Sequence, residues 1–178
     1  FRGIRQGCPI SSLAFVLVVE IMALKLREDN NLKGLEVKLD GRNCSLKICQ
    51  LADDTTLFFK SPKDVSLAMN IIETFGSLSG LQLNRNKTEG FWLGKLKHSR
   101  DKFENINWKT DNIKSLGFYF GYNNQDCQKL NTDKQLKKCE KIISNWMKRN
   151  LTLIGKIIVV KSLILPNLTY IASNMYIP

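Results

Sequence analysis

The strongest constraint on the fold lies in residues 50–59, QLADDTTLFF, where two adjacent carboxylates interrupt a run of strand-forming residues. Neighbouring like charges repel each other and weaken strand pairing, so Asp53 and Asp54 need either a tolerant turn or a cation. Polar and apolar residues alternate again over residues 55–59, which predicts a second strand. The acidic pair is therefore expected at or beside a turn between two strands.

The elements before this pair have clear local signals. Pro9 and a following serine predict the start of a helix that runs through LAFVLVVEIMALKLRE, residues 13–28. This run is apolar nearly all round, so the helix is expected to be buried. Alternation in LEVKL, residues 35–39, followed by Asp40-Gly41, predicts a β-hairpin whose second arm runs into the acidic pair.

A second helix is expected after the pair. Ser61-Pro62-Lys63-Asp64 has the form of a capping box with proline at the first helical position. Apolar residues then follow at helical spacing up to Gly80, at Val65, Met69, Ile72 and Phe75. Short strands are predicted at residues 81–83, 91–93 and 113–120. The order of these elements predicts an α+β fold, with an antiparallel sheet covered by helices.

The composition changes from about Asn124. One helix face is marked by Leu136, Cys139, Ile143 and Trp146, and a second apolar helix is expected over residues 153–165, before Pro166. Nine Lys or Arg oppose three acidic residues over residues 126–178. We therefore predict two parts, residues 1–125 and residues 126–178, with QDCQKLNTDK as the linker.

The whole chain is basic and has few residues suited to other kinds of site. Lys and Arg number 27 against 16 Asp and Glu, a net charge of +11, which favours polyanionic partners. The five cysteines form no C-x-x-C pair, which favours a reduced, intracellular setting. The single histidine, His98, argues against His-rich metal sites. The longest apolar run, residues 13–19, is too short to cross a bilayer, so no membrane partner is expected.

The acidic pair has two interpretations. Asp is a good turn former, so Asp53 and Asp54 could serve the turn alone. Alternatively, apolar strands on both sides would project the short carboxylates from a hairpin tip, where they suit Mg²⁺, a hard cation that prefers oxygen ligands. Adjacent side chains on a strand point to opposite faces, so these two residues cannot build a two-metal site alone. A further carboxylate must come from elsewhere.

Four motifs in order resemble the reverse transcriptases of LINE-type, non-LTR retrotransposons. They are RGIRQGCPISS (2–12), LADDTTLF (51–58), SGLQLNRNKTE (79–89) and IKSLGFYFG (113–121). The segment LTLIGKIIVVKSLILPNLTY (151–170) is also similar to the region after the palm in that family. The resemblance implies a palm with part of a thumb, and an RNA-directed DNA polymerase that uses two Mg²⁺ ions, an RNA template, a DNA primer and deoxynucleoside triphosphates. It also implies a nuclear location, where such elements integrate.

The resemblance implies roles for individual residues. Asp53 matches the metal-binding Asp of the A-D-D motif, and Asp54 its less directly ligating neighbour. Gln6 and Gly7 match an element beside the incoming nucleotide and the template, although Gly7 could also be an ordinary turn glycine. Lys87 matches a lysine near the triphosphate, which could protonate the leaving pyrophosphate or could simply be solvated.

Other implied contacts lie later in the chain. Leu116 and Gly117 match the hairpin that grips the primer end in the family, although alternating apolar side chains there could equally be sheet core. Basic residues of the helical tail could follow the phosphates of the duplex. These are Lys137, Lys138, Lys141, Lys148, Lys156 and Lys161.

The chain departs from the family pattern in three places. Leu51 replaces a common aromatic residue, and Ile10-Ser11-Ser12 replaces a common L-S-P. The family's other metal-binding Asp lies upstream of the QG element, whereas this sequence starts at Phe1. We therefore expect a catalytically incomplete fragment. One alternative is a non-catalytic nucleic-acid-binding remnant of a retroelement. Another is a group II intron maturase, although the QGCP sequence favours the LINE type.

Overall fold

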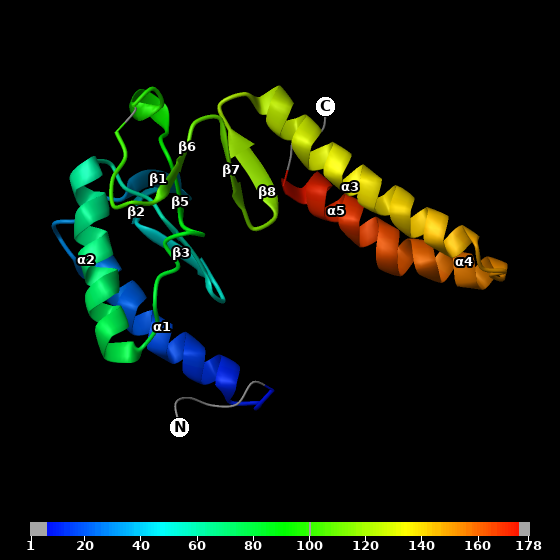
Figure 1. Ribbon diagram of the computed structural model, residues 1–178, viewed down its shortest axis with the longest axis horizontal. Coiled ribbons are helices and arrows are strands. Elements are labelled where there is room, and N and C mark those ends of the chain that lie inside the picture. Colours follow the sequence, from blue (N-terminus) through cyan, green and yellow to red (C-terminus); the bar gives the residue numbers. More distant parts are fainter. Residues whose placement is uncertain (1–6, 100, 175–178) are drawn as a thin grey trace. The chain divides into compact units, whose positions relative to one another are not determined.

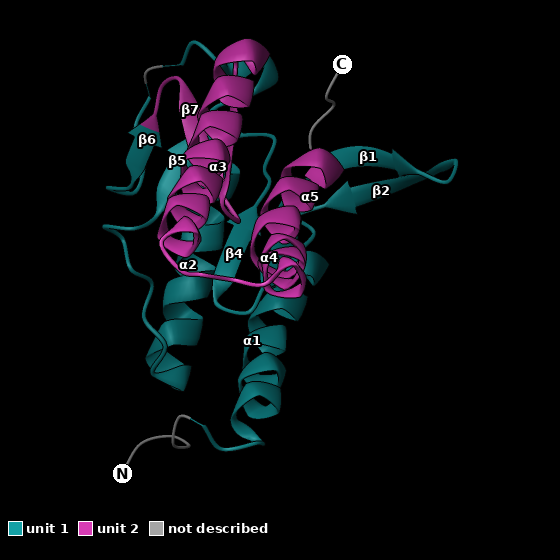
Figure 2. Cartoon of the chain, turned by 90° about the vertical axis from the view of Figure 1, so that its right-hand side faces the viewer, with its two compact units in different colours: residues 1–108 teal, residues 109–178 magenta. Residues whose placement is uncertain are grey.

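The computed structural model describes residues 7–99 and 101–174 and has an α+β fold, as expected from the sequence (Figure 1). Its strands form four separate two-stranded sheets, with pairs β1-β2, β3-β4, β5-β6 and β7-β8. The chain divides into two compact units, Phe1–Trp108 and Lys109–Pro178 (Figure 2). This structural division precedes the predicted boundary at residue 125, and the functional division into palm and thumb stays a prediction.

The first unit contains most of the strands. Its elements are α1 (Ser11–Glu28), β1 (Leu35–Leu39), β2 (Arg42–Leu46), β3 (Ile48–Leu51), β4 (Asp54–Leu57), α2 (Pro62–Ser79), β5 (Glu89–Phe91), the 3₁₀ turn η1 (Gly94–Leu96) and β6 (Asn107–Lys109). Asp40 and Gly41 both have positive φ, 48° and 78°, so they form the expected tight turn between β1 and β2. The second arm ends at Leu46, and β3 is a separate strand.

The core of the first unit lies where α1 and α2 pack together and against β3. Ala23, Leu26 and Ala68 are completely buried there. The two alanines have small side chains, which let the helix backbones approach closely. The core extends to β3 through the buried side chain of Ile48.

The prediction that α1 is buried was wrong. Of the described residues of α1, only Met22, Ala23 and Leu26 are buried. Leu13 and Leu17 are 65% and 69% exposed, because α2 and β3 cover only part of the helix surface. Burial depends on what packs against a helix as well as on its own sequence.

The ends of α2 are as predicted. Ser61 and Asp64 form the capping box, with Pro62 at the first position. Gly80 ends the helix in the left-handed conformation, with φ of 77°. Residues 81–83 form no strand, and β5 begins at Glu89, two residues before the predicted start.

The second unit is a hairpin followed by helices. Its elements are β7 (Asn112–Ser115), β8 (Phe118–Gly121), α3 (Asn124–Met147), α4 (Leu153–Val159), the π-helical turn η2 (Val160–Ile164) and α5 (Leu165–Asn174). The predicted single strand at 113–120 is in fact this hairpin, with a turn at Leu116-Gly117. The predicted linker QDCQKLNTDK is helical, since Asn123 caps α3 by accepting a hydrogen bond from the Gln125 N–H at 3.0 Å.

The last helix continues through Pro166, although the sequence predicted an end there. The turn η2 lies directly upstream, and the N–H of Leu165 bonds to the carbonyl of Val160, five residues back. A wide turn of this kind accommodates the missing N–H and the ring of a proline.

The helices of the second unit pack α3 against β8 and α5. Cys139 is buried on the predicted face of α3, whereas Leu136 and Ile143 are exposed. Leu153–Asn174 is long enough and apolar enough to cross a membrane, with a mean hydropathy of 1.5 over its best window. Core helices of other proteins can be equally long and apolar, so the length and composition of this segment give only weak support for a membrane partner.

Candidate active site

Asp53 and Asp54 lie at the tip of the β3–β4 hairpin. The strands are antiparallel, and Leu51 pairs with Asp54, so that Ala52 and Asp53 form the two-residue connection. Ala52 has a φ of 54°, a left-handed conformation that costs an alanine about 1–2 kcal/mol. The acidic pair therefore lies at a turn between two strands, as the sequence predicted.

The hairpin is anchored at its base and solvated at its tip. Ile48, paired with Leu57 at the base, belongs to the core beside α1. Nearer the tip, the Gln50 side-chain nitrogen Nε2 donates to Thr55 Oγ1 across the strands at 3.2 Å. Asp53 and Asp54 are both exposed. The two carboxylates thus extend into solvent from a support that is fixed by packing, and Gln50 and Thr55 are supporting residues that the sequence did not single out.

The donor chemistry of the pair fits Mg²⁺, but the set of ligands is incomplete. Within residues 7–99 and 101–174, neither Asp53 nor Asp54 forms an ion pair with a basic side chain. Their oxygens are therefore available to a hard cation. No group of three or more His, Cys, Asp or Glu side chains is placed to hold a metal in the described part of the chain. The residues outside that part contain none of these four types.

Lys87 lies in a turn that is held firmly by its neighbours. Its N–H donates to the Asn84 carbonyl at 3.0 Å and to Asn84 Oδ1 at 3.2 Å. Arg85 ties the same turn to Glu73 of α2 and to the carbonyl of Glu104. Residues 82–86 line a shallow pocket of about 410 Å³. Lys87 itself is exposed, and no described hydrogen bond or ion pair joins it to the acidic pair.

Residues 1–120 match the family described as "Reverse transcriptase (RNA-dependent DNA polymerase)", which covers more than half of the 178 residues. This chain belongs to the reverse transcriptase family. The matched range contains the acidic hairpin, the Lys87 turn and the β7–β8 turn.

The chain is also similar to a "Transposon TX1 uncharacterized 149 kDa protein" of Xenopus laevis. The two are 32% identical over 120 residues, which is 66% of this chain and 9% of the relative. The matched segment therefore covers less than a tenth of that protein's length. The two matches together confirm the resemblance to the LINE-type, non-LTR retrotransposon enzymes.

The structure describes only part of the QG element of this chain. Gln6 lies outside the described residues. Gly7 has a φ of 90°, and a Cβ added to it would meet no atom within 4 Å. The backbone conformation therefore favours glycine here, whereas the open surroundings do not require it. A role for these two residues beside the nucleotide and template stays a prediction.

Leu116 and Gly117 belong to the second unit of the chain. Both have positive φ, 48° and 85°, and they form the turn between β7 and β8. The Tyr170 hydroxyl donates a hydrogen bond to the Leu116 carbonyl. Phe118 is buried, whereas Leu116 and Phe120 are exposed, so only part of the alternating set is core. Contact of this turn with a primer stays a prediction.

Proposed function

We propose that this chain carries metal-binding carboxylates of an RNA-directed DNA polymerase. The observation that supports the proposal best is the position of Asp53. It lies in the connection of a hairpin whose base is packed in the core, and its carboxylate has no basic partner among the described residues. Membership of the reverse transcriptase family gives the class of reaction.

The chain's own residues have separate roles in this proposal. Asp53 binds Mg²⁺, and Asp54 supports it as a neighbouring ligand. When bound, the metal stabilises the charge that develops on the transferred phosphoryl group. Lys87, on its fixed turn, approaches the triphosphate. Gln6 and Gly7 lie by the incoming deoxynucleoside triphosphate and the RNA template, while Leu116 and Gly117 contact the DNA primer.

We further propose that the 178-residue chain is inactive on its own. Two adjacent carboxylates cannot complete the metal site alone, because their side chains leave the backbone in different directions. No third ligand accompanies them among the described residues. In this proposal, an Asp from another part of a longer protein completes the site.

The test is primer extension on an RNA template by a longer protein that includes this chain. Asp53→Asn removes a charged ligand and is expected to lower the rate at least about 1,000-fold, the scale on which loss of a catalytic group usually acts. Asp54→Asn is expected to have a smaller effect. Asp40→Asn is the matched control, since Asp40 is an exposed turn residue of the neighbouring β1–β2 hairpin and tolerates asparagine.

Three outcomes separate the hypotheses. Normal extension by the Asp53→Asn variant would refute the assigned metal role. Extension by the purified 178-residue chain alone would refute its incompleteness. If the longer protein binds duplex in a salt-sensitive way but never extends a primer, the non-catalytic remnant is the better interpretation.

A further inference from the structure

The turn that carries Lys87 has little apolar packing of its own. Asn84, Asn86 and Lys87 are all exposed. Residues 82–86 line the shallow pocket of about 410 Å³, so one side of the turn faces open space. The position of the turn therefore depends on polar contacts.

Hydrogen bonds within the turn fix its shape. The N–H groups of Lys87 and Thr88 both donate to the Asn84 carbonyl at 3.0 Å, and Thr88 Oγ1 donates to the same carbonyl at 2.9 Å. The Thr88 carbonyl accepts from the Asn107 N–H at 3.2 Å, which ties the end of the turn to β6. These contacts leave the earlier part of the turn to be held by other groups.

Arg85 joins that earlier part of the turn to two other segments of the first unit. Its Nη2 forms an ion pair with Glu73 of α2, and its Nη1 donates to the carbonyl of Glu104. The helix α2 is a fixed support, because Ala68 is completely buried in the core beside α1. The two ends of the guanidinium group thus hold the turn between a packed helix and the segment before β6.

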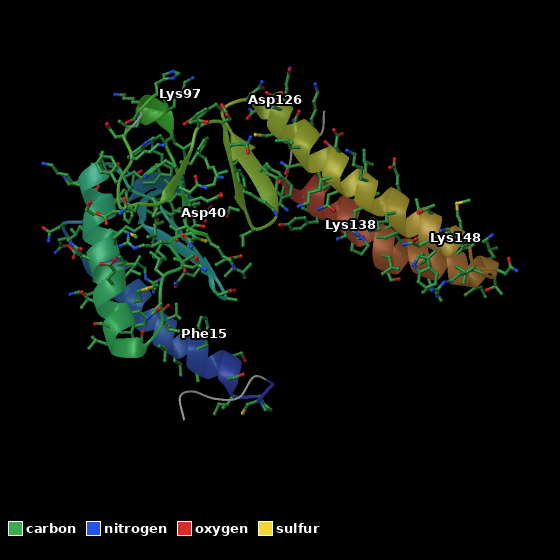
Figure 3. All side chains as sticks on the ribbon, viewed as in Figure 1. Phe15, Asp40, Lys97, Asp126, Lys138 and Lys148 are labelled. Atoms are coloured by element: carbon green, nitrogen blue, oxygen red, sulfur yellow. The ribbon has the colours of Figure 1, made fainter. Side chains whose placement is uncertain are left out.

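The segment before β6 is also well defined where Arg85 contacts it. Glu104 and Asn105 have φ of 59° and 50°, as in a tight turn with two left-handed residues. Trp108 Nε1 donates to the Phe103 carbonyl at 3.1 Å, at the start of this turn. Figure 3 shows Lys97 on the same β5–β6 connection, beside η1. Arg85 therefore contacts the end of a long connection at a point that is held by its own hydrogen bond.

The effect of Arg85 should be local. The side chains of Arg85 and Glu73 are 37% and 51% exposed, and ion pairs so exposed contribute little to global stability because water screens the charges. Loss of Arg85 should therefore release the turn without unfolding the protein. A misplacement of about 1 Å at a reacting group can lower a rate by about 100-fold.

We propose that Arg85 is a positioning residue for the polymerase reaction. It holds the turn so that the ammonium group of Lys87 is placed against the triphosphate, where the charge of that group stabilises the leaving pyrophosphate. This inference rests on the proposed function, which gives Lys87 that place. Arg85 itself does not touch the triphosphate and acts through Lys87. It was not among the residues singled out from the sequence.

The first test is steady-state primer extension on an RNA template by a longer protein that includes this chain. Arg85→Met is expected to lower kcat about 10- to 100-fold and to change the KM for the deoxynucleoside triphosphate less than about threefold. Arg27→Met is the matched control. It removes another partly exposed arginine, whose ion pair with Glu20 lies within α1, and should extend at the wild-type rate.

A double-mutant cycle separates positioning of Lys87 from a general structural role. Lys87→Met is expected to lower kcat at least about 100-fold. If Arg85 acts through Lys87, Arg85→Met should lower kcat less than about twofold further when Lys87 is already methionine. Losses that simply multiply would show that Arg85 acts independently of Lys87 and would overturn the inference.

The position of the turn can be measured without any activity. In ¹⁵N relaxation of the 178-residue chain, Arg85→Met is expected to lower the order parameters of the Lys87 and Thr88 amides from about 0.85 to below about 0.6. The amide of Met69 in α2 should not change. Equal urea midpoints for Arg85→Met and Arg27→Met would show that the fold is preserved.

The failure of this inference is distinct from failure of the proposed function. If Lys87→Met lowers kcat but Arg85→Met extends at the wild-type rate, or leaves the order parameters unchanged, only the inference on Arg85 fails. If Lys87→Met extends normally, the proposed role of Lys87 fails and the inference on Arg85 fails with it. The metal role of Asp53 is judged separately, by Asp53→Asn.

Discussion

The side chain of Asn131 satisfies both backbone hydrogen-bonding groups of Tyr119. Its Oδ1 accepts from the Tyr119 N–H at 2.8 Å, and its Nδ2 donates to the Tyr119 carbonyl at 3.0 Å. A buried side chain of α3 therefore takes the place of a neighbouring strand at the outer edge of β8. The hairpin and the helix are joined by a polar contact as well as by apolar packing.

Replacing Asn131 with leucine is expected to lower the free energy of unfolding by about 2–4 kcal/mol, since two backbone groups of Tyr119 lose their partners in a buried place. Urea titration followed by circular dichroism measures the change. Asn145→Leu is the control, because Asn145 is an exposed residue of the same helix. Equal stability of the two variants would show that the Asn131 contact is unimportant.

Lys47 closes the C-terminal end of α1 from the β2–β3 connection. Its Nζ donates to the carbonyls of Arg27 at 2.7 Å and Asp29 at 2.8 Å. Lys47→Met is therefore expected to reduce stability by about 1–2 kcal/mol, through loss of two charge-assisted hydrogen bonds at a negative helix end. Lys38→Met, at an exposed position of β1, should change the urea midpoint much less.

Ala52→Gly is expected to stabilise the β3–β4 hairpin. Glycine adopts a φ of 54° without steric strain, which stabilises the folded state. This gain exceeds the entropic cost of ordering a glycine, so the free energy of unfolding is expected to rise by about 0.5–1 kcal/mol. Ala14→Gly within α1 should have the opposite sign, since φ there is helical. A lower melting temperature for Ala52→Gly would contradict the strain argument.

Stability should fall at alkaline pH through Cys127. Burial raises the pKa of its thiol above the ordinary value of 9.0, and the charge of Asp126 adds to the shift. The folded state then holds this proton more tightly than the unfolded state, so stability falls as the pH rises from about 9 through the raised value. Urea midpoints between pH 7.5 and 10 should show a shallower decline for Cys127→Ala. Cys44→Ala, which removes an exposed thiol, should keep the wild-type profile.

Local sequence signals predicted the elements that depend on local chemistry. Asp40-Gly41 specifies a turn with two positive φ angles, and Ser61 with Asp64 specifies a capped helix start. The same kind of reasoning placed Asp53 and Asp54 at a turn, because two adjacent charges do not fit within an apolar strand.

The remaining features depend on interactions that no single stretch of sequence contains. Leu116 has a φ of 48° although leucine rarely adopts it, so the turn that splits residues 113–120 was not predicted. Exposure of α1 depends on how much of its surface other elements cover. The approach of Lys114 and Lys134 to the Tyr119 ring needs both the β7–β8 register and the docking of α3, neither of which the sequence spacing indicates.

The π turn η2 also determines which side chains of the last helix share a face. Val159 and Ile171 are both buried and lie twelve residues apart. At about 100° per residue, a regular α-helix would rotate them about 120° from each other. A π turn amounts to one inserted residue, which brings the difference back to about 20° and puts both side chains in phase. Deleting one residue from Val160–Ile164 should therefore be tolerated, because the segment can then form a regular α-helix with Val159 and Ile171 still on one face. Adding one residue should instead rotate Ile171 away from the buried face.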